Sequence, residues 1–180
     1  MLIALAVCVA VLSACGGDTT NNLSASNEGV YVDIGHLKYQ VQLSRELNPY
    51  DQEDSSYLLG LTPRDAKLTP TQAWFGVFML AVNKHNQAYS AAHSYYITDT
   101  QGNAYRPTPV TGPNPFAYHS VVVPGHDQLP TRGSAADDGP TNGLVLLFKV
   151  PLGAFDNRPL VLHIEDPTDP RTRAIVVLDV

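Results

Sequence analysis

The chain has 180 residues and a formal net charge of −6 at pH 7, with 11 Lys and Arg residues against 17 Asp and Glu residues. This negative balance disfavours binding to nucleic acid and electrostatic docking on anionic lipid. Both cysteines, Cys8 and Cys15, lie near the N-terminus, so the rest of the chain contains no disulfide, cysteine nucleophile or thiolate metal site.

The first apolar stretch runs from Leu2 to Leu12 and is too short to cross a bilayer, because a spanning helix needs about 20 residues. Such a stretch is typical of the core of a signal peptide, and the small residues around Ala14 fit a cleavage site. No Lys or Arg precedes the stretch, which departs from the usual basic start of such segments. The polar residues 18–26 that follow predict a flexible tether.

The run Leu12-Ser13-Ala14-Cys15 resembles the lipobox of bacterial lipoproteins. The resemblance implies that residues 1–14 are removed as a signal peptide, that Cys15 receives a diacylglyceryl group, and that the new amino terminus is acylated. It also implies a place in the cell envelope on the extracytoplasmic side of a membrane, facing a periplasm or the cell surface. Residues 15–29 would form the lipidated start and its tether, and residues 30–180 a single folded domain.

From Leu37 onward the sequence predicts β-strands, because apolar and polar residues alternate and Gly, Pro, Asn and Asp separate the runs. Alternate residues from Leu37 to Leu43 share one face, as in a half-buried strand. A long polar insertion follows at residues 45–72. Within it, residues 57–61 suggest an edge strand, and Thr62-Pro63 suggests a brief helical turn.

Residues 73–83 are apolar on both faces, which predicts a central strand covered on both sides. Residues 95–97 and 104–106 flank a turn sequence and predict a hairpin. Residues 126–142 are rich in Gly, Pro, Ser and Asp and predict an exposed loop. Further strands are expected at 116–123, 144–150, 160–165 and 173–180, with Leu160, Leu162 and Ile164 facing inward.

Seven or eight short strands without sustained helical periodicity predict an all-β fold, an antiparallel β-sandwich. The region from Ala73 to Asp166 also resembles the DUF4352-like immunoglobulin-like domains of bacterial lipoproteins. The shared features are a strand that ends in Asn83, a D-x-x-G-x-x-Y hairpin at 99–105, and a later strand at 143–151 that ends in Phe-x-Val-Pro. The resemblance implies an immunoglobulin-like sandwich in a family without a common enzymatic mechanism, so it transfers no functional residues.

No residue pattern assigns a catalytic, cofactor-binding or metal-ligating role. Acidic residues at 165–169 and 137–138 suggest either a calcium site or Asx turns. Ser120 and His119 lack the G-x-S-x-G elbow of a serine hydrolase, and paired carboxylates for glycoside cleavage would meet only in the fold. Zinc or copper would need strands to bring together histidines that show no H-x-H or H-x-x-x-H spacing, namely His36, His85, His93, His119, His126 and His163.

We therefore expect a lipid-anchored extracytoplasmic protein that is not an enzyme, needs no cofactor and acts by binding a protein or another ligand. Long loops on a rigid sandwich are often functional, so residues 45–72 and 126–142 are the expected contact surface. Its expected partners are the membrane, through the anchor, and an envelope protein, with no nucleic acid. The alternative is a metal- or substrate-binding accessory subunit of an envelope transport or enzyme system.

Overall fold

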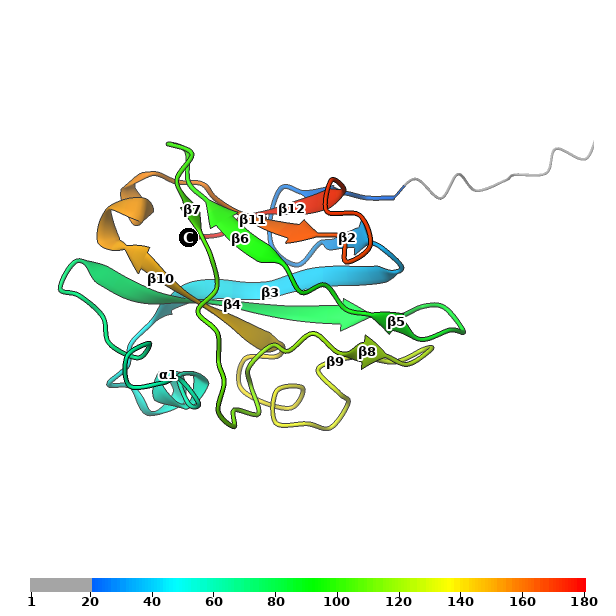
Figure 1. Ribbon diagram of the computed structural model, residues 1–180, viewed down its shortest axis with the longest axis horizontal. Coiled ribbons are helices and arrows are strands. Elements are labelled where there is room, and N and C mark those ends of the chain that lie inside the picture. Colours follow the sequence, from blue (N-terminus) through cyan, green and yellow to red (C-terminus); the bar gives the residue numbers. More distant parts are fainter. Residues whose placement is uncertain (1–20) are drawn as a thin grey trace, which may run out of the picture.

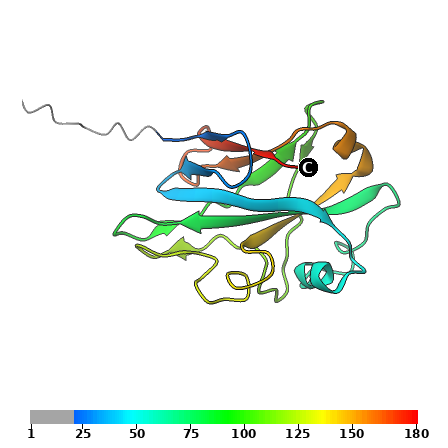
Figure 2. The same cartoon turned by 180° about the vertical axis from the view of Figure 1, so that it is seen from behind.

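The computed structural model describes residues 21–180, so the expected signal peptide and the lipidation site at Cys15 lie outside the described residues. Two sheets pack face to face (Figures 1 and 2). One sheet has the order β10-β4-β3-β2, with bounds Leu144–Pro151, Gln72–Val82, Leu37–Leu47 and Tyr31–Ile34. The other has the order β1-β12-β11-β6-β7, with bounds Ser24–Ala25, Arg173–Leu178, Leu160–Glu165, Tyr95–Thr98 and Ala104–Tyr105.

Shorter elements complete the described chain. The two-residue strand β9 adds to β4, β5 pairs with β8, and two short helical elements lie in connections. Their bounds are β5 Tyr89–Ser90, β8 Val122–Val123, β9 Gln128–Leu129, α1 Gln52–Tyr57 and the 3-10 helix η1 Leu152–Asp156. Across residues 21–180, neither helix has the length and apolar character that a membrane span requires.

The structure confirms the predicted all-β sandwich. Strands β3, β4 and β10 neighbour one another as strands A, B and E do in immunoglobulin domains, and β12, β11 and β6 as strands G, F and C do. Strand β2 is an addition beside β3. Within the described part of the chain, seven strands span four residues or more, in agreement with the expected number.

The main core lies between the two sheets. Leu160, Leu162 and Ile164 of β11 face inward and are fully buried, as predicted from their alternation. Strand β4 is central, as predicted, because its two faces contribute to different cores. Phe75 and Val77 enter the main core, whereas Trp74 and Phe78 point to the outer face of their sheet.

Strand β3 does not keep the uniform alternation that its sequence suggests. Its pairing with β4 shifts between Val41 and Leu43, as at a β-bulge. After the shift Ser44 is buried and Leu43 is 37% exposed, so the expectation that Leu43 shares one face with Leu37 and Val41 is wrong. Glu28 accepts hydrogen bonds from the Ser44 backbone N–H at 3.1 Å and from the Ser44 hydroxyl, so the buried polar residue is satisfied.

The long insertion covers the outer face of the β3-β4-β10 sheet. Tyr57 is 1% exposed and packs edge-on against Phe78 and Phe116, with ring centroids 4.8 and 5.2 Å away. These rings belong to a second core, together with Leu47, Trp74, Val145 and Leu147. Much of the insertion is therefore structural, although the sequence presented it as a polar surface segment.

The edge strand expected at residues 57–61 is not formed, since α1 extends to Tyr57 and a turn follows at residues 58–60. Asp51 caps α1 by accepting from the backbone N–H groups of Glu53 and Asp54 at 2.9 and 3.1 Å. The helical turn expected at Thr62 is present, since the Ala66 N–H donates to the Thr62 carbonyl at 2.8 Å.

The expected exposed loop at 126–142 is only partly exposed. Leu129 pairs with β4 and is buried, and Ala136 is fully buried. Asp137 closes the loop by accepting from Gln128 Nε2 at 3.0 Å and from the Gly133 N–H at 2.9 Å. The strand expected at 116–123 is also shorter, with β8 limited to residues 122–123.

The domain begins earlier than the expected boundary at residue 30. Strand β1 runs parallel to β12, and Ala25 is 4% exposed. The Asp33 N–H donates to the Asn22 carbonyl at 2.7 Å, so residues 22–25 bridge β2 and β12. The expectation of a tether through residue 29 is therefore wrong for residues 22–29, whereas residues 15–20 lie outside the described range.

Candidate functional site

The two long sides of the sandwich differ. Residues 22–25 close the side between β2 and β12. On the opposite side, residues 106–118, here called the crossing segment, leave β7 and run along β10 (Figure 1). Both ends of this segment bond to β10: the Thr108 N–H donates to the Leu147 carbonyl at 2.6 Å, and the Tyr118 N–H donates to the Val145 carbonyl at 2.9 Å. Between these contacts the two sheets leave space.

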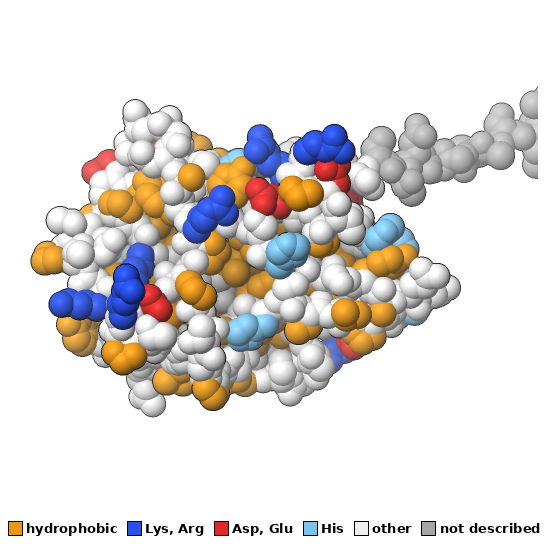
Figure 3. Space-filling model, in the orientation of Figure 1, with side chains coloured by type: hydrophobic (Ala, Val, Ile, Leu, Met, Phe, Trp, Pro, Cys, Tyr) orange, Lys and Arg blue, Asp and Glu red, His pale blue; other side chains and the backbone are white. Residues whose placement is uncertain are grey.

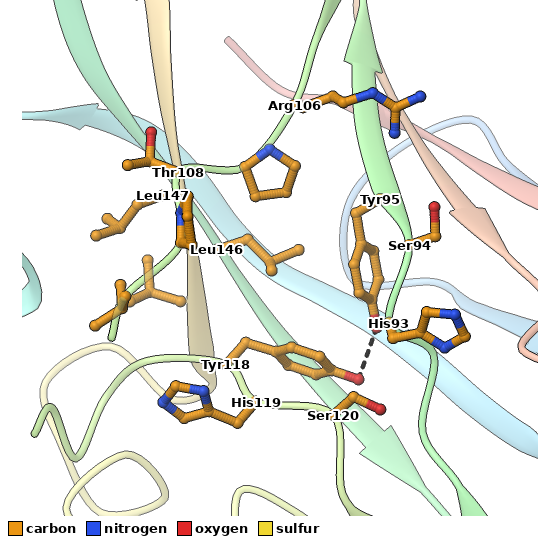
Figure 4. Close-up of a pocket in the computed structure, with 14 residues that line it drawn as sticks. His93, Ser94, Tyr95, Arg106, Thr108, Tyr118, His119, Ser120, Leu146 and Leu147 are labelled. Carbon is orange, nitrogen blue, oxygen red and sulfur yellow. Dashed lines mark hydrogen bonds between the residues drawn. The ribbon is translucent and has the colours of Figure 1, made fainter. Parts of the chain in front are cut away.

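A pocket of about 440 Å³ occupies this space (Figure 4). Its volume lies within the range of about 300 to 1,000 Å³ that is typical of small-molecule sites. Side chains from β6, β10 and the crossing segment line it, and Leu146 points into it. The lining residues are His93, Ser94, Tyr95, Arg106, Pro107, Thr108, Pro109, Val110, Tyr118, His119, Ser120, Val145, Leu146 and Leu147.

Two tyrosines form the floor of the pocket. The rings of Tyr95 and Tyr118 meet edge-on at 5.2 Å, and their hydroxyls lie 2.7 Å apart (Figure 4). Both hydroxyls are within 3.0 Å of the Ala92 carbonyl oxygen, while the Ala92 N–H donates to the Tyr39 hydroxyl at 2.7 Å. This network joins β3, β6 and the crossing segment, so the floor is held from three parts of the chain.

The floor carries no charge at neutral pH. Burial raises the pKa of Tyr39 to about 12 and the pKa values of Tyr95 and Tyr118 well above the ordinary value of a tyrosine. The hydroxyl protons are engaged within the network, so the rings present mainly apolar surface to the cavity.

The rim of the pocket is polar and contains no carboxylate. Arg106, His93 and His119 line the mouth and are exposed. Figure 3 shows histidine, basic and acidic side chains on the face that residues 106–118 cross. The Arg106 guanidinium carbon lies 5.8 Å from the centre of the Tyr96 ring, and that ring stacks on His163 at 4.3 Å. The pocket therefore combines an apolar interior with a rim of hydrogen-bond donors.

His119 and Ser120 directly follow the crossing segment and form no catalytic pair. The Ser120 hydroxyl donates to the Ala91 carbonyl at 2.7 Å, so its proton is engaged with the backbone. Within residues 21–180 no hydrogen bond joins Ser120 to a histidine. The arrangement that activates a serine nucleophile is not assembled at this site.

The histidines do not converge on a metal centre. His36 and His85 approach each other, with ring centroids 5.8 Å apart, and Tyr89 stacks on His36 at 4.1 Å. His163 lies on the outer face of β11, 2.9 Å from the Thr98 hydroxyl. Across the described range 21–180, no group of three or more His, Cys, Asp or Glu residues is placed to hold a metal ion.

The acidic turn at 165–169 is explained by the Asx-turn alternative. Asp166 Oδ1 accepts from the backbone N–H groups of Thr168 and Asp169 at 2.7 and 3.2 Å, and also from the Thr168 hydroxyl at 2.7 Å. The carboxylate thus organises the β11-β12 turn. Asp137 has the same kind of role in the loop before β10.

Sequence reasoning missed the pocket, because its lining comes from four separate stretches of chain. The two segments expected to form a contact surface, 45–72 and 126–142, contribute no lining residue. They approach each other beside α1, where the Thr141 hydroxyl lies 3.5 Å from Glu53 Oε1. The one available signal was the proline-rich stretch 107–115, which favours an extended crossing segment.

No family model matches the chain, and no curated protein matches it. Two solved structures align with most of its length. The yjhA protein of Bacillus subtilis aligns with a TM-score of 0.47 and 9% sequence identity, covering 86% of this chain and 99% of that chain. An uncharacterized β-sandwich protein of Clostridium difficile 630 aligns with a TM-score of 0.46 and 10% identity, covering 86% of this chain and 95% of that chain.

Proposed function

We propose that this protein is a lipid-anchored extracytoplasmic module that binds a small ligand in the pocket between β6 and β10 and does not transform it. The observation that carries this proposal is the cavity itself, an apolar space of about 440 Å³ with a polar rim. Small-molecule sites commonly combine an apolar lining with a few polar groups that orient the ligand. The engaged Ser120 hydroxyl supports a binding role over hydrolysis.

The pocket is also well supported by the fold. Leu146 and Leu147 belong to β10, which pairs with the central strand β4 along its whole length. The crossing segment is fixed at its turn by Asn114, whose side-chain amide donates to the Tyr57 and Leu59 carbonyls at 2.8 and 2.9 Å. A preformed site loses little conformational entropy on binding, so more of the contact energy is available for affinity.

The lipid anchor is proposed from the lipobox-like sequence, and the domain boundary gives it a geometric consequence. If Cys15 carries the lipid, only residues 16–21 separate it from the strands that begin near Asn22. Six residues span at most about 20 Å when fully extended. We therefore propose that the domain stays close to the membrane surface, where it would meet ligands or protein partners of the envelope.

Nuclear magnetic resonance tests the binding site directly. The mature chain, residues 15–180 with Cys15→Ser, would be labelled with nitrogen-15 and titrated with N-phenyl-1-naphthylamine, a neutral aromatic probe. We expect amide shift changes at the non-proline residues among 93–95, 106–110, 118–120 and 145–147, which line the pocket. The amides of the insertion at 62–68 serve as an internal control. Binding confined to the control region, or no shift change at the pocket, would refute the proposed site.

A further inference from the structure

We infer that the pocket selects an amphipathic anion, a small molecule with an apolar body and one carboxylate or sulfonate group held at the rim by Arg106. This inference rests on the proposed binding function and adds the chemical class of the ligand. It follows from three features of the described residues: the charge of the lining, the absence of a partner for Arg106, and the polarity of the pocket from floor to rim.

The charge of the lining is opposite to that of the whole chain. The chain has a net charge of −6, yet the pocket is lined by one guanidinium, two imidazoles and no carboxylate. A patch of such composition on an acidic protein provides a local preference for anions. The same patch disfavours a cationic ligand, because no acidic group among the lining residues would pair with it.

Arg106 has no anionic partner within residues 21–180. The ion pairs of this region use other residues, namely Lys38 with Asp33, Arg45 with Glu53 and Asp54, and Arg171 with Asp169. Arg106 instead lies near the face of Tyr96. Its planar set of N–H donors therefore remains available, and this geometry suits a carboxylate or sulfonate.

Glu165 is an acidic residue close to the pocket, because it is hydrogen-bonded to the lining residue Ser94. The Ser94 hydroxyl donates to Glu165 Oε2, and Glu165 stands opposite Arg173 in the β11-β12 pairing. Its side chain does not line the cavity. The carboxylate is thus placed on the outer face of the sheet and does not occupy the position that we assign to the ligand anion.

The pocket changes from apolar to polar along its depth. Tyr95 and Tyr118 use their hydroxyl protons within the floor network, so the floor favours the apolar end of a ligand. Arg106, His93 and His119 line the pocket and are exposed, and Figure 4 draws them around its edge. A ligand is therefore oriented with its apolar body inside and its anionic group at the rim, where water also reaches the charge.

Two matched fluorescent probes test this inference. 1-Anilinonaphthalene-8-sulfonate is N-phenyl-1-naphthylamine with one added sulfonate, so the pair differs only in the anionic group. Both would be titrated into the mature Cys15→Ser chain and into the same chain with Arg106→Gln. Arg64→Gln is the matched control, because Arg64 is exposed and lies outside the pocket. This substitution changes the net charge of the chain by the same amount as Arg106→Gln. Thermal denaturation would verify that each variant is folded.

We expect Arg106→Gln to weaken sulfonate binding by about two- to fivefold, as for one exposed ion pair, and to leave the neutral probe's dissociation constant unchanged. Arg64→Gln should alter neither. An equal effect of Arg106→Gln on both probes, or no effect on either, would overturn the inference while leaving pocket binding intact. If neither probe shifts the pocket amides in the magnetic resonance experiment, the proposed function fails together with the inference.

Discussion

Asn83, the residue that ends the central strand β4, should be one of the most sensitive polar positions in the domain. Its side chain is fully buried. The amide group Nδ2 lies 2.7, 3.0 and 3.0 Å from the carbonyl oxygens of Gln87, Val123 and Pro124, and Oδ1 accepts from the His85 N–H at 2.9 Å. One side chain thus joins the β4-β5 connection to the segment that contains β8.

The cost of Asn83→Ala can be estimated from these bonds. Each hydrogen bond contributes about 1 kcal/mol net, and a buried partner left without a bond costs about 1 to 3 kcal/mol. Because the two N–H groups share three carbonyls, we count three effective bonds and expect a loss of about 3 to 4 kcal/mol. For a domain of this size, that loss lowers the melting temperature by about 6 to 15 °C.

Urea denaturation followed by Trp74 fluorescence measures this loss, because Trp74 is the single tryptophan and is buried in the folded state. Asn27→Ala is the control, since Asn27 is exposed and bonds only to its neighbours Ser26 and Glu28. It should change stability by less than about 0.5 kcal/mol. Asn83→Asp should be at least as damaging as Asn83→Ala, because it turns a carboxylate oxygen toward three carbonyls. A loss below about 1 kcal/mol for Asn83→Ala would show that the bonds do not anchor the loops.

Three further predictions concern other parts of the chain. The pKa of Asp99 is lowered to about 2, mainly because the Asn103 side chain donates to its carboxylate, with a further bond from the Tyr105 hydroxyl. The charged carboxylate therefore stabilises the fold above about pH 4 and loses this effect as the pH falls toward 2, so Asp99→Asn should reduce stability at pH 7 and flatten the acid slope in urea titrations at several pH values. Tyr57→Ala should cost about 3 to 5 kcal/mol and make residues 48–71 sensitive to limited proteolysis, whereas equal protection in both proteins would contradict a second core. In the full chain, Cys15→Ser should move the protein out of the membrane fraction, as measured by fractionation and lipid labelling, and unchanged membrane retention would refute the anchor.

The fold class could be predicted because the strands carry their own periodicity. Leu160, Leu162 and Ile164 alternate with polar or half-buried residues, and their inward orientation follows from that pattern. The sequence also predicted the hairpin at 99–105, and the structure explains its motif. Asp99 accepts hydrogen bonds from the backbone N–H groups of Gln101 and Asn103 and from the Tyr105 hydroxyl. These interactions are local in sequence, so local patterns are sufficient to detect them.

Expectations were wrong where a distant segment decides burial. Leu43 follows the alternation of its strand, but a register shift against β4 turns it outward. Tyr57 lies in a polar stretch, and only its contact with Phe78 and Phe116 shows that the insertion builds a second core. The sequence predicts a tether through residue 29, but the two residues of β1 gain their structure by pairing with β12, about 150 residues later in the chain.

The sequence alone therefore determined the all-β class and the central strand, because both depend on residues that are adjacent or alternate along the chain. The tertiary structure alone decided the pocket. Tyr95, Tyr118 and Leu146 come from three separate segments, and their convergence depends on how the two sheets diverge and how residues 106–118 cross between them. No local pattern encodes that spacing, because it results from the packing of sheets whose strands are distant in sequence.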